Sequence, residues 1–222
     1  MFGKGYIEDS LCGVKFQISA SSFYQINPKQ TEILYQTAIR AAQLDGSQSV
    51  LDAYCGVGTI GLVAAGQAKS VLGVEVNKSA VKCAVENARK NGITNARFLC
   101  EDATEYMKQM AARGERVDVV FMDPPRAGST PEFLEAVSKM SPERIVYISC
   151  DPKTQKRDLE ILVEKGWKVD MIQGVDLFPQ TKHLETVCLL SNRKLKPDTY
   201  VKLSLDAEDY YRFRDAEDKV ND

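Results

Sequence analysis

The sequence contains no run of about 18 apolar residues, the length that a helix needs to cross a membrane. Its first residues, MFGKGYIEDS, also lack the apolar segment of a secretory signal peptide. We therefore expect a cytoplasmic protein that does not associate with membranes. With 222 residues, 44% of them hydrophobic, the chain is long enough to bury a substantial core.

Closely spaced cysteines are absent, and there is only one histidine. Without a CxxC pair, no zinc or redox site is predicted, and we expect no bound metal. A cytoplasmic chain keeps its thiols reduced, so most of its cysteines are expected to be small apolar residues of the core. The six cysteines are Cys12, Cys55, Cys83, Cys100, Cys150 and Cys188.

An excess of positive charge is absent too. The formal net charge is -2 and the sequence pI is about 5.6. A domain that binds nucleic acid unaided is usually basic. The charge balance therefore argues against tight, independent binding of nucleic acid by this chain.

What the sequence does contain is a succession of short apolar runs and amphipathic segments. Apolar and polar residues alternate from Tyr6 to Ile18 on both sides of Gly13, which predicts a β-hairpin. Asn27-Pro28 then predicts the start of a helix, because Asn caps helix N-termini and Pro suits the first helical position. Apolar residues recur at helical spacing after it, and Gly46 lies beyond the expected end of this helix.

Seven apolar runs follow as predicted strands. They are Ser49–Tyr54, Ser70–Val74, Ala96–Leu99, Val117–Met122, Arg144–Ser149, Lys168–Ile172 and Thr186–Leu190. Predicted helices lie between most of them, for example Ser79–Asn91, Pro131–Met140 and Lys153–Lys165. This alternation predicts a doubly wound α/β domain with a mostly parallel, seven-stranded sheet. No clear helix separates the last two runs, so they predict a hairpin with an antiparallel strand at one edge of the sheet.

The chain divides into three parts on this evidence. Residues 1–24 form a β-hairpin extension, residues 25–193 the α/β domain, and residues 194–222 an acidic C-terminal tail. The tail is rich in Asp and Glu but retains a few aromatic residues, so we expect it to pack only in part on the domain.

A glycine-rich turn follows the first predicted strand of the domain, in the segment Leu51–Gly61 (LDAYCGVGTIG). Gly56 and Gly58 permit a tight turn and a close approach to a ligand, which in this fold class binds beyond the C-terminal ends of the strands. GxGxxG alone also fits a nicotinamide dinucleotide site or a mere tight turn. Asp52 before the glycines and Glu75 at the end of the next strand make the arrangement resemble the class I S-adenosylmethionine methyltransferases, whose cofactor carries a sulfonium cation.

Two further residues are candidates for cofactor contact. Tyr54 stands beside the glycines, although it is equally typical of a core aromatic residue. Asp102 follows the third predicted strand of the domain, a position that contacts adenine in the fold that this arrangement resembles. Asp102 also fits a helix cap.

The fourth strand of the domain runs directly into Asp123-Pro124-Pro125-Arg126. Proline must end the strand, because it lacks an amide donor and fixes φ. The result is a rigid rim that carries a carboxylate and a guanidinium. D/N-P-P at this place resembles methyltransferases that act on planar bases, and the alternative is a proline-rich turn with solvated charges.

Cys150 ends the fifth strand and is followed at once by helical periodicity. A position near a helix N-terminus is predicted to favour the thiolate. A soft thiolate can add to C6 of a uracil and make C5 nucleophilic, so that C5 accepts a methyl group; a base must then remove the C5 proton before the thiol leaves. Glu185, at the start of an apolar strand where burial would raise its pKa, is the candidate base, with His183 as a candidate support.

Taken together, these motifs resemble the RNA uracil-5-methyltransferase family, which acts on tRNA and 23S rRNA. The resemblance covers about Phe23 to Arg193 and rests on FYQIN, DAYCGVGTIG, GVEV, DPPRAG, SCDP and HLETV, in the family's order. It implies S-adenosyl-L-methionine as cofactor, RNA as partner, Cys150 as nucleophile and Glu185 as base. It also implies cofactor contacts from Gln25, Tyr54, Glu75 and Asp123.

The chain departs from this family at its start. Members usually carry an upstream RNA-binding β-barrel and a central domain, and some hold an iron–sulfur cluster through upstream cysteines. We therefore expect a piece of a longer protein, without that cluster and without the basic surface that would grip RNA. Arg126, Lys153, Lys156 and Arg157 are candidates for contacts with RNA phosphates, and a solvated helix face is the alternative for the last three.

Three other functions stay open. A nucleic-acid amino-methyltransferase would use Asp-Pro-Pro without covalent catalysis and would stay active without the Cys150 thiol. An NAD-dependent oxidoreductase would bind NAD instead of S-adenosylmethionine. A catalytically weak or non-catalytic RNA-binding module would retain the fold alone.

Overall fold

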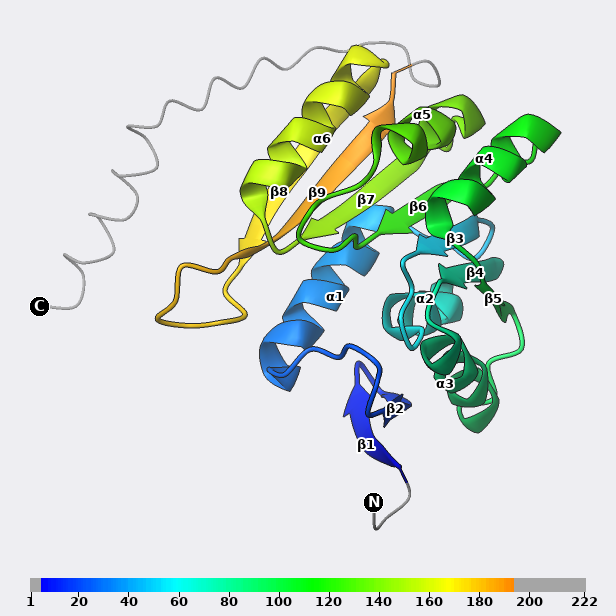
Figure 1. The fold of residues 1–222 in the computed structure, drawn as a ribbon, viewed down its shortest axis with the longest axis vertical. Coiled ribbons are helices and arrows are strands. Elements are labelled where there is room, and N and C mark those ends of the chain that lie inside the picture. Colours follow the sequence, from blue (N-terminus) through cyan, green and yellow to red (C-terminus); the bar gives the residue numbers. More distant parts are fainter. Residues whose placement is uncertain (1–4, 194–222) are drawn as a thin grey trace, which may run out of the picture.

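The computed structural model describes residues 5–193, in which helices cover both faces of a large β-sheet and a small hairpin lies at one end (Figure 1). The strands of the large sheet are β3 (Ser49–Ala53), β4 (Ser70–Glu75), β5 (Ala96–Cys100), β6 (Val119–Met122), β7 (Arg144–Ser149), β8 (Trp167–Val175) and β9 (Glu185–Asn192). The helices are α1 (Pro28–Ala42), α2 (Thr59–Ala64), α3 (Lys78–Lys90), α4 (Ala103–Arg113), α5 (Pro131–Met140) and α6 (Pro152–Glu164), with a 3-10 turn η1 (Ala65–Gln67).

The large sheet has the strand order β5-β4-β3-β6-β7-β9-β8. The first five strands are parallel, and β9 is antiparallel to both β7 and β8. The predicted α/β fold with a mostly parallel, seven-stranded sheet is thus confirmed, with its antiparallel pairing at the expected edge. There β8 is outermost and β9 lies between β8 and β7.

The chain changes direction across the sheet between β3 and β6. From β3 it proceeds outward to β4 and β5, and then it returns to β6 and continues the other way. Loops on the two sides of this switch point diverge and leave a crevice beyond the C-terminal ends of the strands. The fold therefore places a binding crevice at the ends of β3 and β6.

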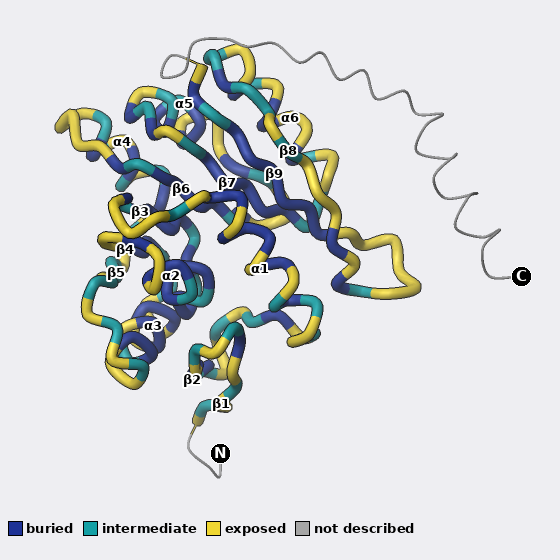
Figure 2. Tube along the Cα trace, turned by 180° about the vertical axis from the view of Figure 1, so that it is seen from behind, coloured by how far each residue is buried: buried dark blue, intermediate teal, exposed yellow. Residues whose placement is uncertain are grey.

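The central strands are buried on both faces, which explains why their sequences are continuously apolar. Val119 and Phe121 of β6 face the core that packs under α1, α2 and α3. Val120 and Met122 face the second core, under α4, α5 and α6. Figure 2 shows these strands as the dark centre of the domain, with exposed residues in the surrounding loops and helices.

The N-terminal hairpin forms as predicted, from β1 (Tyr6–Leu11) and β2 (Val14–Ser19). It packs on α3 through two asparagine side chains. The Asn87 side chain accepts a hydrogen bond from the Gln17 amide at 2.7 Å, and the Asn91 side chain accepts one from the Lys15 amide at 2.9 Å. The hairpin is therefore joined to the α/β domain by specific polar contacts.

The first helix also begins where the sequence predicts. Pro28 is its first residue, and the Asn27 side chain accepts a hydrogen bond from the Gln30 amide at 3.4 Å. The acidic tail predicted for residues 194–222 lies outside the described residues. Within residues 5–193, none of the helices combines the length and apolar character of a membrane span.

Candidate active site

A cavity of about 670 Å³ lies beyond the C-terminal ends of the parallel strands. The loops after β3, β4, β5, β6 and β7 contribute to its wall, together with the segment before α1. Because β9 is antiparallel, its first residue lies at the same edge of the sheet and also reaches the cavity. The predicted site residues that line it are Gln25, Tyr54, Gly56, Glu75, Asp102, Asp123, Arg126, Cys150 and Glu185.

The glycine-rich turn forms one side of the cavity. Gly56 and Gly58 have φ angles of +56° and +83°, a backbone region that suits glycine. The Gly56 amide donates to Glu75 Oε2 at 3.1 Å, so the turn and the end of β4 support each other. Gly58 does not line the cavity: a Cβ there would lie 3.0 Å from the Phe98 ring, so this glycine permits close packing behind the turn.

Asp52 lies beneath the turn rather than in the cavity. Its side chain is buried and its Oδ2 accepts a hydrogen bond from the Gly61 amide at 2.8 Å. Burial raises the pKa of Asp52 to about 7. A Cβ at position 61 would lie 2.8 Å from Oδ2, so the third glycine of the motif makes room for this carboxyl group. The acidic residue of the motif thus ties α2 to β3.

Tyr54 and Asp102 each make a structural contact and also lie on the cavity wall. The Tyr54 ring packs 5.4 Å from the Phe133 ring between centroids, and its hydroxyl lies 3.0 Å from Ser129 Oγ, while the same residue lines the cavity. Asp102 caps α4, since its Oδ1 accepts from the Glu105 amide at 3.0 Å. It also lies on the cavity wall.

The cavity wall also holds two carboxyl groups, a thiol and a guanidinium, from Asp123, Glu185, Cys150 and Arg126. Glu185 is only 3% exposed, although it carries an ionisable group. Burial raises the pKa of Glu185, and the positive charge of Arg126 opposes that shift. Burial, then the negative charges of Glu185 and Asp52, raises the pKa of Asp123 to about 8. These carboxyl groups therefore lie in an environment that disfavours their ionised forms.

The surroundings of Cys150 differ from the prediction. The amides of the first turn of α6 are capped by Asp151, whose Oδ1 accepts from Lys153 and Thr154 at 2.9 and 3.3 Å. The carboxylate cancels much of the positive field that was expected to favour the thiolate. Burial and the Glu185 carboxylate raise the pKa of Cys150, whereas a hydrogen bond with Arg126 lowers it. The group that favours the thiolate is therefore Arg126 and not the helix end.

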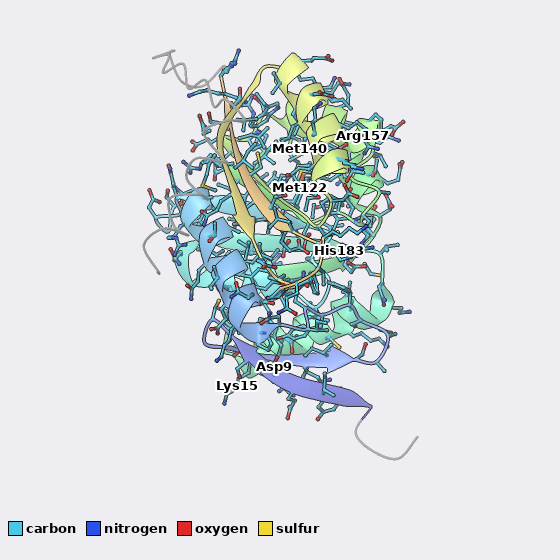
Figure 3. All side chains as sticks on the ribbon, turned by 90° about the vertical axis from the view of Figure 1, so that its left-hand side faces the viewer. Asp9, Lys15, Met122, Met140, Arg157 and His183 are labelled. Atoms are coloured by element: carbon cyan, nitrogen blue, oxygen red, sulfur yellow. The ribbon has the colours of Figure 1, made fainter. Side chains whose placement is uncertain are left out.

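The remaining basic candidates lie outside the cavity. Arg157, labelled on α6 in Figure 3, is committed to contacts with Asp158 and with the backbone of the loop after β6. Lys156 pairs with Glu160 at 3.6 Å on the exposed face of α6, where Lys153 is also exposed. His183 lies in the exposed loop between β8 and β9, its ring edge-on to Phe178. The structure does not bring these side chains to the reactive groups.

Sequence reasoning missed several aromatic residues of the cavity wall. Phe23 is 77% exposed, and Phe178 comes from the loop before β9. Tyr35 of α1 is buried, and its hydroxyl lies 3.2 Å from Thr59 Oγ1. Phe23 had a signal in the sequence, as had Tyr24, which also lines the cavity: they are the first two letters of FYQIN.

Comparison with known sequences places this site in a family. The sequence model of the tRNA (uracil-5-)-methyltransferase family matches residues 1–193. The chain belongs to this family. It is 47% identical over 190 residues to an uncharacterized RNA methyltransferase of Halalkalibacterium halodurans, covering 86% of this chain and 42% of the relative. With one of Staphylococcus epidermidis it shares 50% identity over 194 residues, covering 87% and 42%. The chain thus spans less than half the length of these family members.

Two solved structures resemble this chain. The tRNA (uracil-54, C5)-methyltransferase of Pyrococcus abyssi, in complex with S-adenosyl-L-homocysteine, has a TM-score of 0.74 and 32% identity, over 85% of this chain and 45% of that one. An S-adenosylmethionine-dependent methyltransferase of Agrobacterium tumefaciens has a TM-score of 0.65 at 20% identity, over 86% and 70% of the two chains. The second likeness concerns the fold alone.

Proposed function

We propose that this chain is the catalytic part of an enzyme that transfers a methyl group from S-adenosyl-L-methionine to C5 of a uridine in tRNA or 23S rRNA. The observation that carries the proposal is the meeting of Cys150, Arg126 and Glu185 in one cavity, which the Gly56 turn also lines. Membership of the family supports it, as does the substrate in the name of the Pyrococcus abyssi enzyme.

The residues present fit this cofactor. The cavity is large enough for a nucleoside, and Glu75 at the end of β4 is placed to accept hydrogen bonds from ribose hydroxyls. Asp123 shares the cavity with Glu185, and a cationic ligand would favour the ionised forms of both. Gln25, Tyr54, Gly56 and Asp102 complete the candidate contacts. Together with Glu75 and Asp123, they are the residues that we expect to hold the cofactor. When bound, the cofactor supplies an electrophilic methyl group.

The reactive side chains have distinct roles. Arg126 favours loss of the Cys150 proton, and the thiolate adds to C6 of the uracil, so that the C5–C6 double bond becomes an enolate with a nucleophilic C5. After C5 is methylated, Glu185 removes the C5 proton, the C5–C6 double bond re-forms and the thiolate leaves. A Glu185 carboxylate with a raised pKa is a stronger base than an ordinary glutamate.

The proposal is tested with RNA that contains 5-fluorouridine, incubated with S-adenosylmethionine and analysed by mass spectrometry. Fluorine at C5 prevents the final proton removal, so a covalent protein–RNA adduct should accumulate. The Cys150→Ala variant should form none. The Cys100→Ala variant, which changes an exposed cysteine outside the cavity, should form as much as the parent.

The base is tested separately with ordinary uridine RNA. Glu185→Gln removes the proton acceptor but leaves the nucleophile, so the methylated adduct should persist in this variant. A protein that binds both S-adenosylmethionine and RNA but forms no adduct with either RNA would contradict the proposal and favour methyl transfer to an exocyclic amine.

A further inference from the structure

A buried carboxylate joins the two elements that carry Arg126 and Cys150. Asp158, on α6, is 0% exposed. Its Oδ2 accepts hydrogen bonds from the Ser129 amide and the Tyr147 hydroxyl, both at 2.7 Å. Its Oδ1 accepts from Arg157 Nε at 2.9 Å and Nη2 at 2.7 Å. These hydrogen-bond partners belong to the loop after β6, to β7 and to α6.

The loop that carries Arg126 is hydrogen-bonded to α6 through several of its backbone carbonyl groups. Arg157 Nη2 donates to the carbonyl oxygens of Ala127 at 3.0 Å and Ser129 at 3.2 Å. Thr154 Oγ1 donates to the carbonyl oxygen of Arg126 itself at 3.1 Å. Since α6 begins two residues after Cys150, these bonds fix the backbone of Arg126 relative to the thiol.

Gly128 shows how closely the loop lies against this network. Its φ is +77°, and a Cβ at this position would lie 2.6 Å from Arg157 Nη2 and 2.7 Å from Asp158 Oδ2. The loop can therefore reach both groups only because residue 128 has no side chain. Ser129 Oγ lies 3.0 Å from the hydroxyl of Tyr54, another residue of the cavity wall, so the same network continues to the loop after β3.

We propose that Asp158 is a positioning residue of this active site, which acts through Arg157 and the loop of residues 126–129 to hold Arg126 against the Cys150 thiol. The proposal deepens the proposed function and rests on it for the catalytic meaning of that thiol. Arg126 and Cys150 line the same cavity, and the effect of one on the other can be measured without RNA or cofactor.

An asparagine cannot replace Asp158 in this network. Its side chain offers one acceptor oxygen and one NH₂ group, which donates. The NH₂ group would face either the two N–H groups of Arg157 or the Ser129 amide. In both orientations the buried NH₂ group would face another donor, so one of the bonds that hold the loop would be lost.

The charges that face the thiol give the expected direction of the effect. Burial raises the pKa of Cys150 most; Glu185 from β9 and Asp123 from the end of β6 raise it further when they are ionised, while Arg126 lowers it. Without a fixed Arg126, the thiol faces only the two carboxyl groups. The thiolate should then form at a higher pH.

The test is the rate at which iodoacetamide alkylates Cys150 in the full chain, measured by mass spectrometry from neutral to alkaline pH. Asp158→Asn should move the pH profile upward by about one unit, so that alkylation at neutral pH slows about tenfold. Arg157→Lys should give a smaller shift in the same direction, because it keeps the charge but loses the second guanidinium nitrogen. It also serves if Asp158→Asn fails to fold, since Arg157 is 52% exposed.

A double variant separates positioning from general loosening. Arg126→Gln should shift the profile by itself, and adding Asp158→Asn should give no further shift, because both changes remove one contact. The matched control is Asp118→Asn. Asp118 accepts two hydrogen bonds of 2.7 Å from Ser49, at the N-terminal ends of β3 and β6, far from the cavity. Loss of this carboxylate should lower stability without moving the pH profile.

The proposal is overturned if folded Asp158→Asn and Arg157→Lys both keep the parental profile, or if the shift of Asp158→Asn adds in full to that of Arg126→Gln. Alkylation requires neither RNA nor S-adenosylmethionine. A protein that binds RNA and S-adenosylmethionine and shows the shift, but forms no uracil adduct, would refute the proposed function and leave Asp158 as the residue that positions Arg126. An adduct without the shift would do the opposite.

Discussion

Asp123 lies on the cavity wall, in surroundings where its ionised form destabilises the folded protein. Its pKa is raised to about 8, from 3.8, first by burial and then by the charges of Glu185 and Asp52. Between these two pH values the folded protein binds a proton that the unfolded chain has released. The free energy of unfolding must therefore fall as pH rises through this window. Replacing Asp123 by Asn removes the titrating group and should remove this loss of stability.

The magnitude follows from the same two values. At pH 7 the carboxyl group is about three pH units above its unfolded pKa, which corresponds to about 4 kcal/mol. Asp123 keeps some contact with solvent in the cavity, so we reduce this figure to about 2 kcal/mol. Asp123→Asn should thus be more stable than the parent by about 2 kcal/mol at neutral pH, or about 4–8 °C in Tm for a chain of this size.

Thermal unfolding at a series of pH values is the appropriate assay. The difference in Tm between the variant and the parent should be close to zero near the unfolded pKa of 3.8 and grow toward pH 8. Asp102→Asn is the control: it changes an exposed carboxylate on the same cavity wall and keeps the cap of α4, because Asn caps as well as Asp. A variant less stable than the parent, or a gain that does not depend on pH, would refute the reasoning. The same substitution should weaken binding of S-adenosylmethionine, since a neutral amide does not attract a cation.

Two further predictions concern how the site is supported. Gly73→Ala should destabilise the protein by at least about 2 kcal/mol in urea unfolding, since its Cβ would lie 2.4 Å from the Phe98 ring, whereas Gly66→Ala, with open space around it, should be nearly neutral. Asn87→Ala should cost about 3 kcal/mol, because its buried side chain makes two hydrogen bonds to the backbone of Gln17, 2.7 and 3.2 Å long. Hydrogen exchange should show loss of protection at the Gln17 amide; unchanged protection would mean that other contacts, such as those of Asn91 with Lys15, hold the hairpin.

The sequence alone predicted the architecture well, because its signals are local. Asn27-Pro28 starts a helix through its own backbone chemistry, and the bounds of β7 and α5 match their predictions. The cavity was predictable for a related reason. Parallel strands end at one edge of the sheet, so Gly56, Glu75, Asp123 and Cys150, each at or just after a strand end, had to meet there.

Roles within the site were less predictable, because one residue type serves several purposes. Asp102 both caps a helix and lines the cavity, and no local pattern distinguishes these roles. Gly58 belongs to the glycine motif, yet the group that leaves no room for a side chain there is the Phe98 ring, from a strand distant in the sequence. Tyr35 lies on a helix face that periodicity identifies only as buried.

The electrostatic environment of Cys150 was decided by the tertiary structure alone. The sequence indicates a helix N-terminus beside the thiol, but not that Asp151 takes its amides or that Arg126 and Glu185 reach the thiol from other elements. Likewise, Arg157 reads in the sequence as a candidate for binding phosphate. The sequence determined which elements form and at which edge their ends meet, since these depend on neighbours along the chain. Only the tertiary structure decided which charges lie within contact of one another, because burial and Coulomb interactions depend on distance in space.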